Sequence, residues 1–417
     1  MSTTTNTNIQ TQDISLSDRV NRIKPSPTLA VTQRAAKLRA EGKDIIDLGI
    51  GEPDFDTPEH IKEAAIKAIR DGKTKYTNVD GIPSLKEAIV QKFSQFNKLN
   101  YEPNQIIAST GGKQCIFNLL QAYINDGDEV IIPAPYWVSY PDMTLIVGGK
   151  PVIIKTTLEQ HFKITAEQLE AAVTPKTRML MINSPSNPSG LAYTKEELSS
   201  LAAVLGRHPK ILIATDDMYE HILWDHKPFY NLAMVCPELV SRTVVLTGVS
   251  KTYAMTGWRI GYAAGPEKLI KAMTKIQGQS TSNPCSIAQA AAEAALRGNL
   301  DAVSIMLKAF KQRHDFVVSE LNKIPGVECL KGDGTFYAFP RVQKAIDNIP
   351  SIKNDLELSE HLLVNSGLAV VPGSAFGSEG HLRLSFATSM EALEKAMDRL
   401  KSFFLKERQT RLLTHGS

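Results

Sequence analysis

Seven short apolar segments between residues 105 and 264 constrain the fold of this chain more than any other feature. Several have no polar residue inside them, which is typical of strands buried on both faces of a mainly parallel sheet. Amphipathic stretches such as 113–124 and 195–205 separate most of them and predict helices. The pattern therefore predicts an α/β fold with a doubly wound, mostly parallel sheet. The apolar segments are 105–109, 129–134, 151–155, 178–183, 210–215, 243–248 and 259–264.

The sequence on either side of this region predicts a second, smaller part of the molecule. Residues 18–42 have a mostly helical pattern with a break at Pro25-Ser26-Pro27. A further helix is expected from Thr57-Pro58, with threonine as the cap and proline in the first turn. Towards the C-terminus, the pattern predicts a helical stretch from about 286, strands at 336–339 and 381–386, and a last helix from 389.

These patterns divide the chain into five segments. We expect a large α/β domain at 58–314 and a small α+β domain at 315–410, with the N-terminal segment 18–57 packing on the small domain. Residues 1–17 are polar and almost uncharged, so we expect a disordered tail there, and a second tail at 411–417.

The composition is that of a soluble globular protein and indicates no nucleic-acid or membrane partner. Lys and Arg number 47 against 44 Asp and Glu, so no bulk positive charge points to nucleic acid. There is no apolar run of ~18 residues that could span a membrane, and no signal-peptide pattern. His221 and His226 are five residues apart and do not share a helical face, so no zinc site is expected. The four cysteines are widely spaced, which indicates reduced thiols and a cytoplasmic location: Cys115, Cys236, Cys285 and Cys329.

Polar side chains follow four of the predicted strands at the point where each strand ends. Ligands of open α/β sheets bind at this carboxyl edge, so the clustering predicts a binding or catalytic site. The Thr-Gly-Gly turn opens a helix and suits an anion, although a tight turn alone also requires glycine. Taking the four strands as neighbours, we expect these groups to meet: residues 110–113, residues 184–190, Asp216 with Tyr219, and Ser250 with Lys251.

Lys251 is the most informative single residue. Lysine is rarely buried without a partner, so its position at the end of a buried strand needs an explanation. One interpretation is that the side chain reaches solvent or pairs with Asp216 or Asp217. The other is an amine that forms a Schiff base, with a pKa lowered by loss of hydration and by nearby cations.

The sequence resembles the class I aminotransferases, which are fold-type I enzymes that use pyridoxal phosphate. The similarity runs from about residue 18 to residue 406, and its closest branch is that of the bacterial-type aspartate aminotransferases. It rests on eight motifs in order: LGIGEPDFDTP (48–58), KYTNVDGIPSLKEAI (75–89), STGGKQ (109–114), PAPYWVSYP (133–141), NSPSNPSG (183–190), DDMYE (216–220), SKTYAMTGWRIGY (250–262) and LRLSF (382–386).

The resemblance implies a set of cofactor contacts. Lys251 forms the Schiff base and moves the proton, Asp216 pairs with the pyridine nitrogen, and Trp137 stacks on the ring. Tyr219 and Asn187 hydrogen-bond the phenolic oxygen of the ring. The phosphate is expected to contact Gly112, Lys113, Ser250, Arg259 and, from a second subunit of a homodimer, Tyr76. Asp217, Ser186, Ser189 and Gly248 depart from the usual motifs at positions away from the central chemistry.

The resemblance also implies a substrate site for amino acids and 2-oxo acids. Arg383 is expected to bind the α-carboxylate through a bidentate fork, assisted by Asn187, Trp137 and the backbone at Gly51. Lys113, helped by Thr28, is expected to bind the second carboxylate of an acidic substrate. Taken singly, Trp137 could be core, Arg259 a surface ion pair and Arg383 a solvent-facing residue of a strand with alternating side chains.

These roles predict an aspartate aminotransferase with ping-pong transfer between aspartate or glutamate and their 2-oxo acids. A bifunctional aspartate/prephenate aminotransferase stays open, followed by an aromatic or alanine aminotransferase and a lyase acting on a carbon–sulfur bond. A non-catalytic regulator with the same fold is the most remote alternative, since such proteins usually carry a DNA-binding domain ahead of it.

Overall fold

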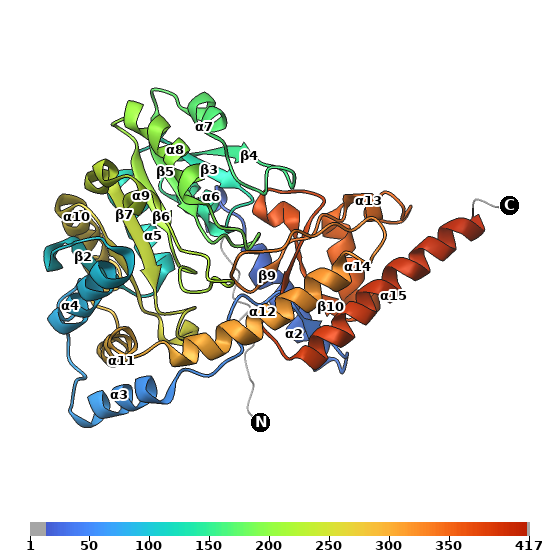
Figure 1. The fold of residues 1–417 in the computed structure, drawn as a ribbon, viewed down its shortest axis with the longest axis horizontal. Helices are drawn as coiled ribbons and strands as arrows, with labels where there is room; N and C mark the ends of the chain where they lie inside the picture. The colour runs from blue at the N-terminus through green and yellow to red at the C-terminus, as the bar shows by residue number, and fades with distance from the viewer. Residues whose placement is uncertain (1–13, 415–417) are drawn as a thin grey trace, which may run out of the picture.

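The computed structural model describes residues 14–414 (Figure 1). A seven-stranded sheet forms its larger part, with strand order β2-β8-β7-β6-β5-β3-β4. All seven apolar segments form strands of this sheet, so the predicted α/β class with a mostly parallel sheet is confirmed. The strands are β2 (Ile106–Ser109), β3 (Glu129–Ala134), β4 (Lys150–Lys155), β5 (Thr177–Asn183), β6 (Leu212–Asp216), β7 (Thr243–Gly248) and β8 (Gly261–Ala264).

Helices cover both faces of the sheet because its strands are apolar on both sides. Successive residues alternate between the faces, so Leu246 packs with one set of helices and Val245 with the other. The first set is α5 (Gly112–Tyr123), α6 (Ser139–Ile146) and α10 (Glu267–Gly278). The second is α3 (Glu59–Arg70), α4 (Pro83–Lys92), α7 (Ala166–Ala172), α8 (Lys195–Arg207), α9 (Leu232–Val235) and α11 (Ser286–Arg297).

A smaller sheet and four helices enclose a separate hydrophobic core at the C-terminal end of the chain (Figure 1). The sheet is antiparallel, with strand order β11-β12-β9. The predicted boundary at 314/315 falls inside the long helix α12 and stays a prediction. The elements are β9 (Tyr337–Ala338), β11 (Val371–Pro372), β12 (Leu382–Ser385), α12 (Asp301–Leu321), α13 (Gln343–Ile346), α14 (Asp355–Ser366) and α15 (Met390–Thr414).

The N-terminal segment lies beside these C-terminal elements (Figure 1). Strand β1 (Ile46–Asp47) pairs in parallel with β10 (Leu368–Ala369). The preceding helices are α1 (Asp18–Asn21) and α2 (Pro27–Ala40). The tail predicted at 1–17 lies mostly outside the described residues. The remaining short helices are η1 (Phe93–Asn97), η2 (Pro103–Gln105), η3 (Pro237–Arg242), η4 (Thr256–Trp258) and η5 (Gly373–Phe376).

Two local expectations were wrong. Thr57 does not cap α3, because its hydroxyl donates to Ala254 O at 2.7 Å and the helix begins at Glu59 with Pro58 before it. The four strand ends are also not all neighbours, since β8 lies between β2 and β7 and runs antiparallel to both. Because β2 and β7 are each antiparallel to β8, they still end at the same edge. Within residues 14–414, no helix is long and apolar enough to cross a membrane.

Candidate active site

A cavity of about 430 Å³ lies at the carboxyl ends of the parallel strands, where the larger sheet faces the C-terminal part. Besides Thr28, which was expected only to help Lys113, eleven of the twelve site residues predicted from the sequence line it. Tyr76 is the exception, and its side chain is 91% exposed. The eleven are Gly51, Gly112, Lys113, Trp137, Asn187, Asp216, Tyr219, Ser250, Lys251, Arg259 and Arg383.

Asp216 is a buried carboxylate at the end of β6. It accepts hydrogen bonds from the Tyr140 hydroxyl and from Met218 N at 3.2 Å. Asn183 Nδ2 holds the backbone by donating to Asp216 O at 2.8 Å. Burial raises the pKa of Asp216 to about 6, although the Tyr140 hydrogen bond opposes this shift. No role for Tyr140 was expected from the sequence, although the residue lies within the PAPYWVSYP motif.

Lys251 follows β7 and is partly buried. Its Nζ donates to Gly51 O. Burial lowers the pKa of Lys251 to about 8; the Glu52 charge opposes this, whereas the charges of Arg383 and Arg259 add to it. In the described part of the chain the amine forms no ion pair with Asp216 or Asp217. A lysine with a lowered pKa is suited to act as a nucleophile and as a base.

Arg383 is a buried cation whose hydrogen-bond partners are neutral. The residue is 2% exposed; Nη1 donates to Asn187 Oδ1 at 3.0 Å and Nη2 to Gly49 O at 2.6 Å. Within residues 14–414, its Nε has no hydrogen-bond partner. The guanidinium lies 4.5 Å from the ring centroid of Tyr337, whose hydroxyl is 3.0 Å from that of Tyr219. Buried charges are normally paired, so this arrangement suits an anionic ligand. Tyr337 had been predicted only as part of a strand.

The part of the cavity at the N-terminus of α5 is cationic, and its two cations, Lys113 and Arg259, are exposed. Helix α5 begins there with Gly111 at φ +87°, and a Cβ at Gly111 would overlap the Arg259 guanidinium. Lys113 Nζ lies 4.9 Å from the Trp137 ring centroid. Loss of hydration, and then the Arg259 charge, lower the pKa of Lys113. A helix N-terminus with bare glycine amides and two cations is suited to bind a phosphate.

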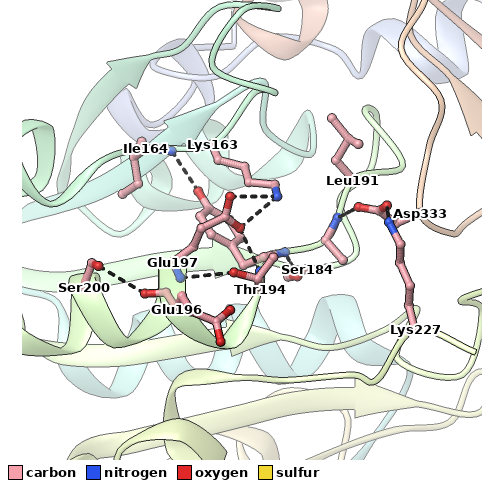
Figure 2. A network of polar contacts seen from close by, with 12 residues as sticks. Lys163, Ile164, Ser184, Leu191, Thr194, Glu196, Glu197, Ser200, Lys227 and Asp333 are labelled. Atoms are coloured by element: carbon pink, nitrogen blue, oxygen red, sulfur yellow. Dashed lines mark hydrogen bonds and ion pairs between the residues drawn. The ribbon is translucent and has the colours of Figure 1, made fainter.

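A set of backbone contacts holds the turn that carries Asn187. Gly190 O accepts hydrogen bonds from Asp333 N at 2.8 Å and Gly334 N at 2.9 Å. The Asp333 carboxylate in turn accepts from Ala192 N at 2.9 Å and from Lys227 Nζ (Figure 2). The turn is thereby tied to the segment that leads into Tyr337. On the N-terminal side, Thr28, Leu29 and Thr32 of α2 also line the cavity, and of these only Thr28 was expected.

Comparisons with known proteins agree on one family. A family model described as "Aminotransferase class I and II" matches residues 43–400. An aspartate/prephenate aminotransferase of Nitrosomonas europaea is 58% identical over 93% of this chain and 99% of its own length. One of Cereibacter sphaeroides is 53% identical over 93% and 98%.

Solved structures give the same result. The aspartate aminotransferase from Rhizobium meliloti matches with a TM-score of 0.91 and 48% identity, over 93% of this chain and 98% of that one. The enzyme from Thermus thermophilus with maleate matches with a TM-score of 0.88 and 42% identity, over 93% and 99%.

Proposed function

Since the chain belongs to the class I and II aminotransferases, we propose that it transfers amino groups between aspartate and 2-oxo acids that include prephenate. The chain is a pyridoxal-phosphate-dependent aminotransferase, with amino acids and 2-oxo acids as substrates. One observation carries the finer proposal: a single cavity joins the amine of Lys251, the buried carboxylate of Asp216 and two separate cationic centres, at Arg383 and Lys113.

The residues of the cavity fit pyridoxal phosphate. The cationic N-terminus of α5 suits the phosphate, with Gly112, Ser250 and Arg259 as its contacts. Asp216 provides the anion expected beside the pyridine nitrogen. The unpartnered Nε of buried Arg383 leaves a donor for a ligand carboxylate. When bound, pyridoxal phosphate supplies an electron-withdrawing ring that stabilises negative charge developing at the α-carbon of the amino acid.

The protein side of the reaction follows from the positions of these groups. Lys251 Nζ would take the proton from the α-carbon of the amino acid, hold it and then give it back. Its lowered pKa allows both transfers near neutral pH. Asp216 would keep the pyridine nitrogen of bound pyridoxal phosphate protonated, and Tyr219 and Asn187 would hydrogen-bond its phenolic oxygen. Arg383 orients the substrate through its α-carboxylate.

The substrate proposal depends on the second cation. Aspartate and prephenate each carry two carboxylates, and Lys113 would bind the one that Arg383 does not. From the sequence, aspartate aminotransferase was the first expectation and the aspartate/prephenate enzyme the second. The relatives named above favour the second, because curated proteins over 50% identical carry that description.

We further propose that two copies of this chain share their sites. The motif resemblance implies that Tyr76 reaches the phosphate of a second subunit, and Tyr76 is absent from the residues that line its own cavity. A tyrosine contributed to the site of a second copy accounts for both observations. A cytoplasmic location stays part of the same proposal.

The experiment is a pair of half-reactions on the purified protein loaded with pyridoxal phosphate. Aspartate should convert the cofactor absorbance to that of the amine form, and prephenate added afterwards should restore it. If 2-oxoglutarate restores the cofactor absorbance and prephenate does not, the protein is an aspartate aminotransferase and the prephenate part of the proposal is wrong. An absorbance that responds to another amino acid but not to aspartate would overturn the substrate assignment.

A further inference from the structure

The acidic and hydroxyl side chains of the turn after β6 lie on two sides of the larger sheet. Asp216 and Tyr219 line the cavity. Asp217 and Glu220 are 0% and 3% exposed and are not among the residues that line it. The reason is strand alternation, which turns the residue after Asp216 to the face covered by α4 and α9. Two buried acidic groups therefore lie directly behind the residues that face the cofactor.

Glu220 is the centre of a buried polar cluster. Its carboxylate accepts hydrogen bonds from Lys92 Nζ, from Asn97 Nδ2 at 2.9 Å and from Thr247 Oγ1 at 3.1 Å. Lys92 also donates to Asn97 Oδ1 at 2.9 Å. The Lys92 and Glu220 side chains are 6% and 1% exposed. Burial acts to raise the pKa of Glu220, but the charges of Lys92 and His221 and the hydrogen bonds outweigh it and lower the pKa.

A local change of helix type brings the two donors together. Lys92 ends α4, and Asn97 ends the π-helix η1 that follows. Residues five apart diverge on an α-helix, which has 3.6 residues per turn. The i→i+5 hydrogen bonds of a π-helix widen the turn, so that both side chains reach the same carboxylate.

The cluster is also tied to the strand that carries the reactive lysine. The single hydroxyl proton of Thr247 in β7 is shared between the Glu220 carboxylate at 3.1 Å and Asp217 O at 3.3 Å. The Asp217 carboxyl accepts from Asn231 Nδ2 at 2.6 Å and from Thr215. The turn from Asp216 to Glu220 is thus held by strand pairing at one end and by a buried ion pair at the other.

We propose that Glu220 and Lys92, with Asn97 and Thr247, are positioning residues that fix the Asp216 carboxylate and the Tyr219 hydroxyl for the cofactor. This inference rests on the proposed function. When the ion pair is lost, the turn relaxes, and the two groups that face the cofactor lose their fixed positions. Affinity for pyridoxal phosphate falls, and the pH at which the bound chromophore titrates moves, because those groups set its protonation.

The test compares E220Q and K92M with wild type. Cofactor-free protein is titrated with pyridoxal phosphate for its Kd, and the loaded protein is titrated with acid and base for the pH midpoint of its absorbance. Both variants should bind the cofactor about ten- to a hundredfold more weakly, the usual effect of removing a supporting partner, with a displaced midpoint.

K163M is the matched control. Lys163 is a similarly shielded lysine, 11% exposed in its side chain, that pairs with Glu197 at 2.8 Å (Figure 2). K163M should keep the wild-type Kd and midpoint.

If E220Q and K92M match wild type in both readouts, the inference is wrong even when both melt at a lower temperature, since the pair would then serve folding alone. Should K92M fail to fold, E220Q decides by itself, because glutamine keeps the shape of the side chain. Wild-type protein that binds the cofactor but does not transaminate aspartate would overturn the proposed substrate and leave intact the cofactor assignment, which is the part of the proposed function that this inference rests on.

Discussion

Among residues 14–414, Arg383 is a buried cation and Lys251 a partly buried one, and neither forms an ion pair with a carboxylate. Burial disfavours the charged form, and for Lys251 the result is a pKa of about 8 against 10.5 for a free lysine. A folded protein without its cofactor therefore holds an amine that would be more stably charged in the unfolded chain. Such local instability is common at catalytic sites, where residues are selected for chemistry.

K251M should stabilise the cofactor-free protein at neutral pH. Because the folded pKa of Lys251 is depressed, the unfolded state binds more protons between about pH 8 and 10.5, and the native state is disfavoured as pH falls through this window. Below both pKa values, each pH unit by which the folded pKa lies under the unfolded one costs the native state about 1.4 kcal/mol. Thermal unfolding should show the variant above wild type at pH 7 and the difference shrinking near pH 10. Equal differences at both pH values would contradict the pKa argument.

K113A should change substrate preference more than turnover. If Lys113 binds the second carboxylate, its loss raises KM for aspartate on the order of tenfold or more, as expected for a hydrogen bond to a charged group. KM for an uncharged amino acid should change little. Steady-state kinetics with both donors provide the measurement, and equal effects on the two KM values would reject Lys113 as the specificity residue.

At the scale of elements, the close approach of β8 to the N-terminus of α5 shapes the anion end of the cavity. Gly261 lies in β8 beside Gly111 and Gly112, and a Cβ there would overlap the Gly112 amide nitrogen. Glycine in a strand often marks such an approach of two backbones. The position of the helix N-terminus thus depends on a strand whose direction the sequence did not reveal.

G261A should displace the start of α5 and weaken cofactor binding. Overpacking of this kind costs about 1–3 kcal/mol, and here the strain falls on the amides proposed to bind the phosphate. The readouts are the melting temperature and the Kd for pyridoxal phosphate. The control is G206A in α8, where an added Cβ meets nothing within 4 Å, so alanine should be neutral or stabilising. Unchanged cofactor affinity in G261A would contradict the prediction.

At the scale of the whole molecule, the question is whether one chain makes a complete site. The cavity gathers residues from α2, from the larger sheet and from β12, which are far apart in sequence. Tyr76 remains outside it. A homodimer in which each copy completes the site of the other is the arrangement that the proposal requires.

Mixing two inactive or weakened variants tests this arrangement. K251A loses the base and should fall about 10²- to 10⁴-fold in rate, while Y76F loses the hydroxyl proposed to reach the phosphate of the other copy. In a mixed dimer one site carries both defects and the other carries none. Unfolding and refolding the two variants together should therefore give aspartate turnover above that of an equal mixture of the two variants refolded separately. No gain, with dimers present by size, would place Tyr76 outside the shared site.

The sequence by itself determined the α/β class and the position of the site along the chain. Uninterrupted apolar segments report burial on both faces, and polar residues after strands mark the edge where side chains can meet. This is why Lys251 and Asp216 could be predicted before any contact was visible, whereas Arg383, which lies inside β12, was expected only from the resemblance to the class I aminotransferases. The domain boundaries and the individual roles of the site residues remain predictions.

The tertiary structure decided which groups act as partners. Tyr140 reaches Asp216 across 76 positions and Lys92 reaches Glu220 across 128, and no local pattern records such pairings. Likewise, Thr57 is a good cap in sequence terms, but its hydroxyl is bound to Ala254 O. Hydrophobic periodicity is a property of neighbouring residues, whereas hydrogen-bond partners and pKa values depend on which distant side chains share the same desolvated space.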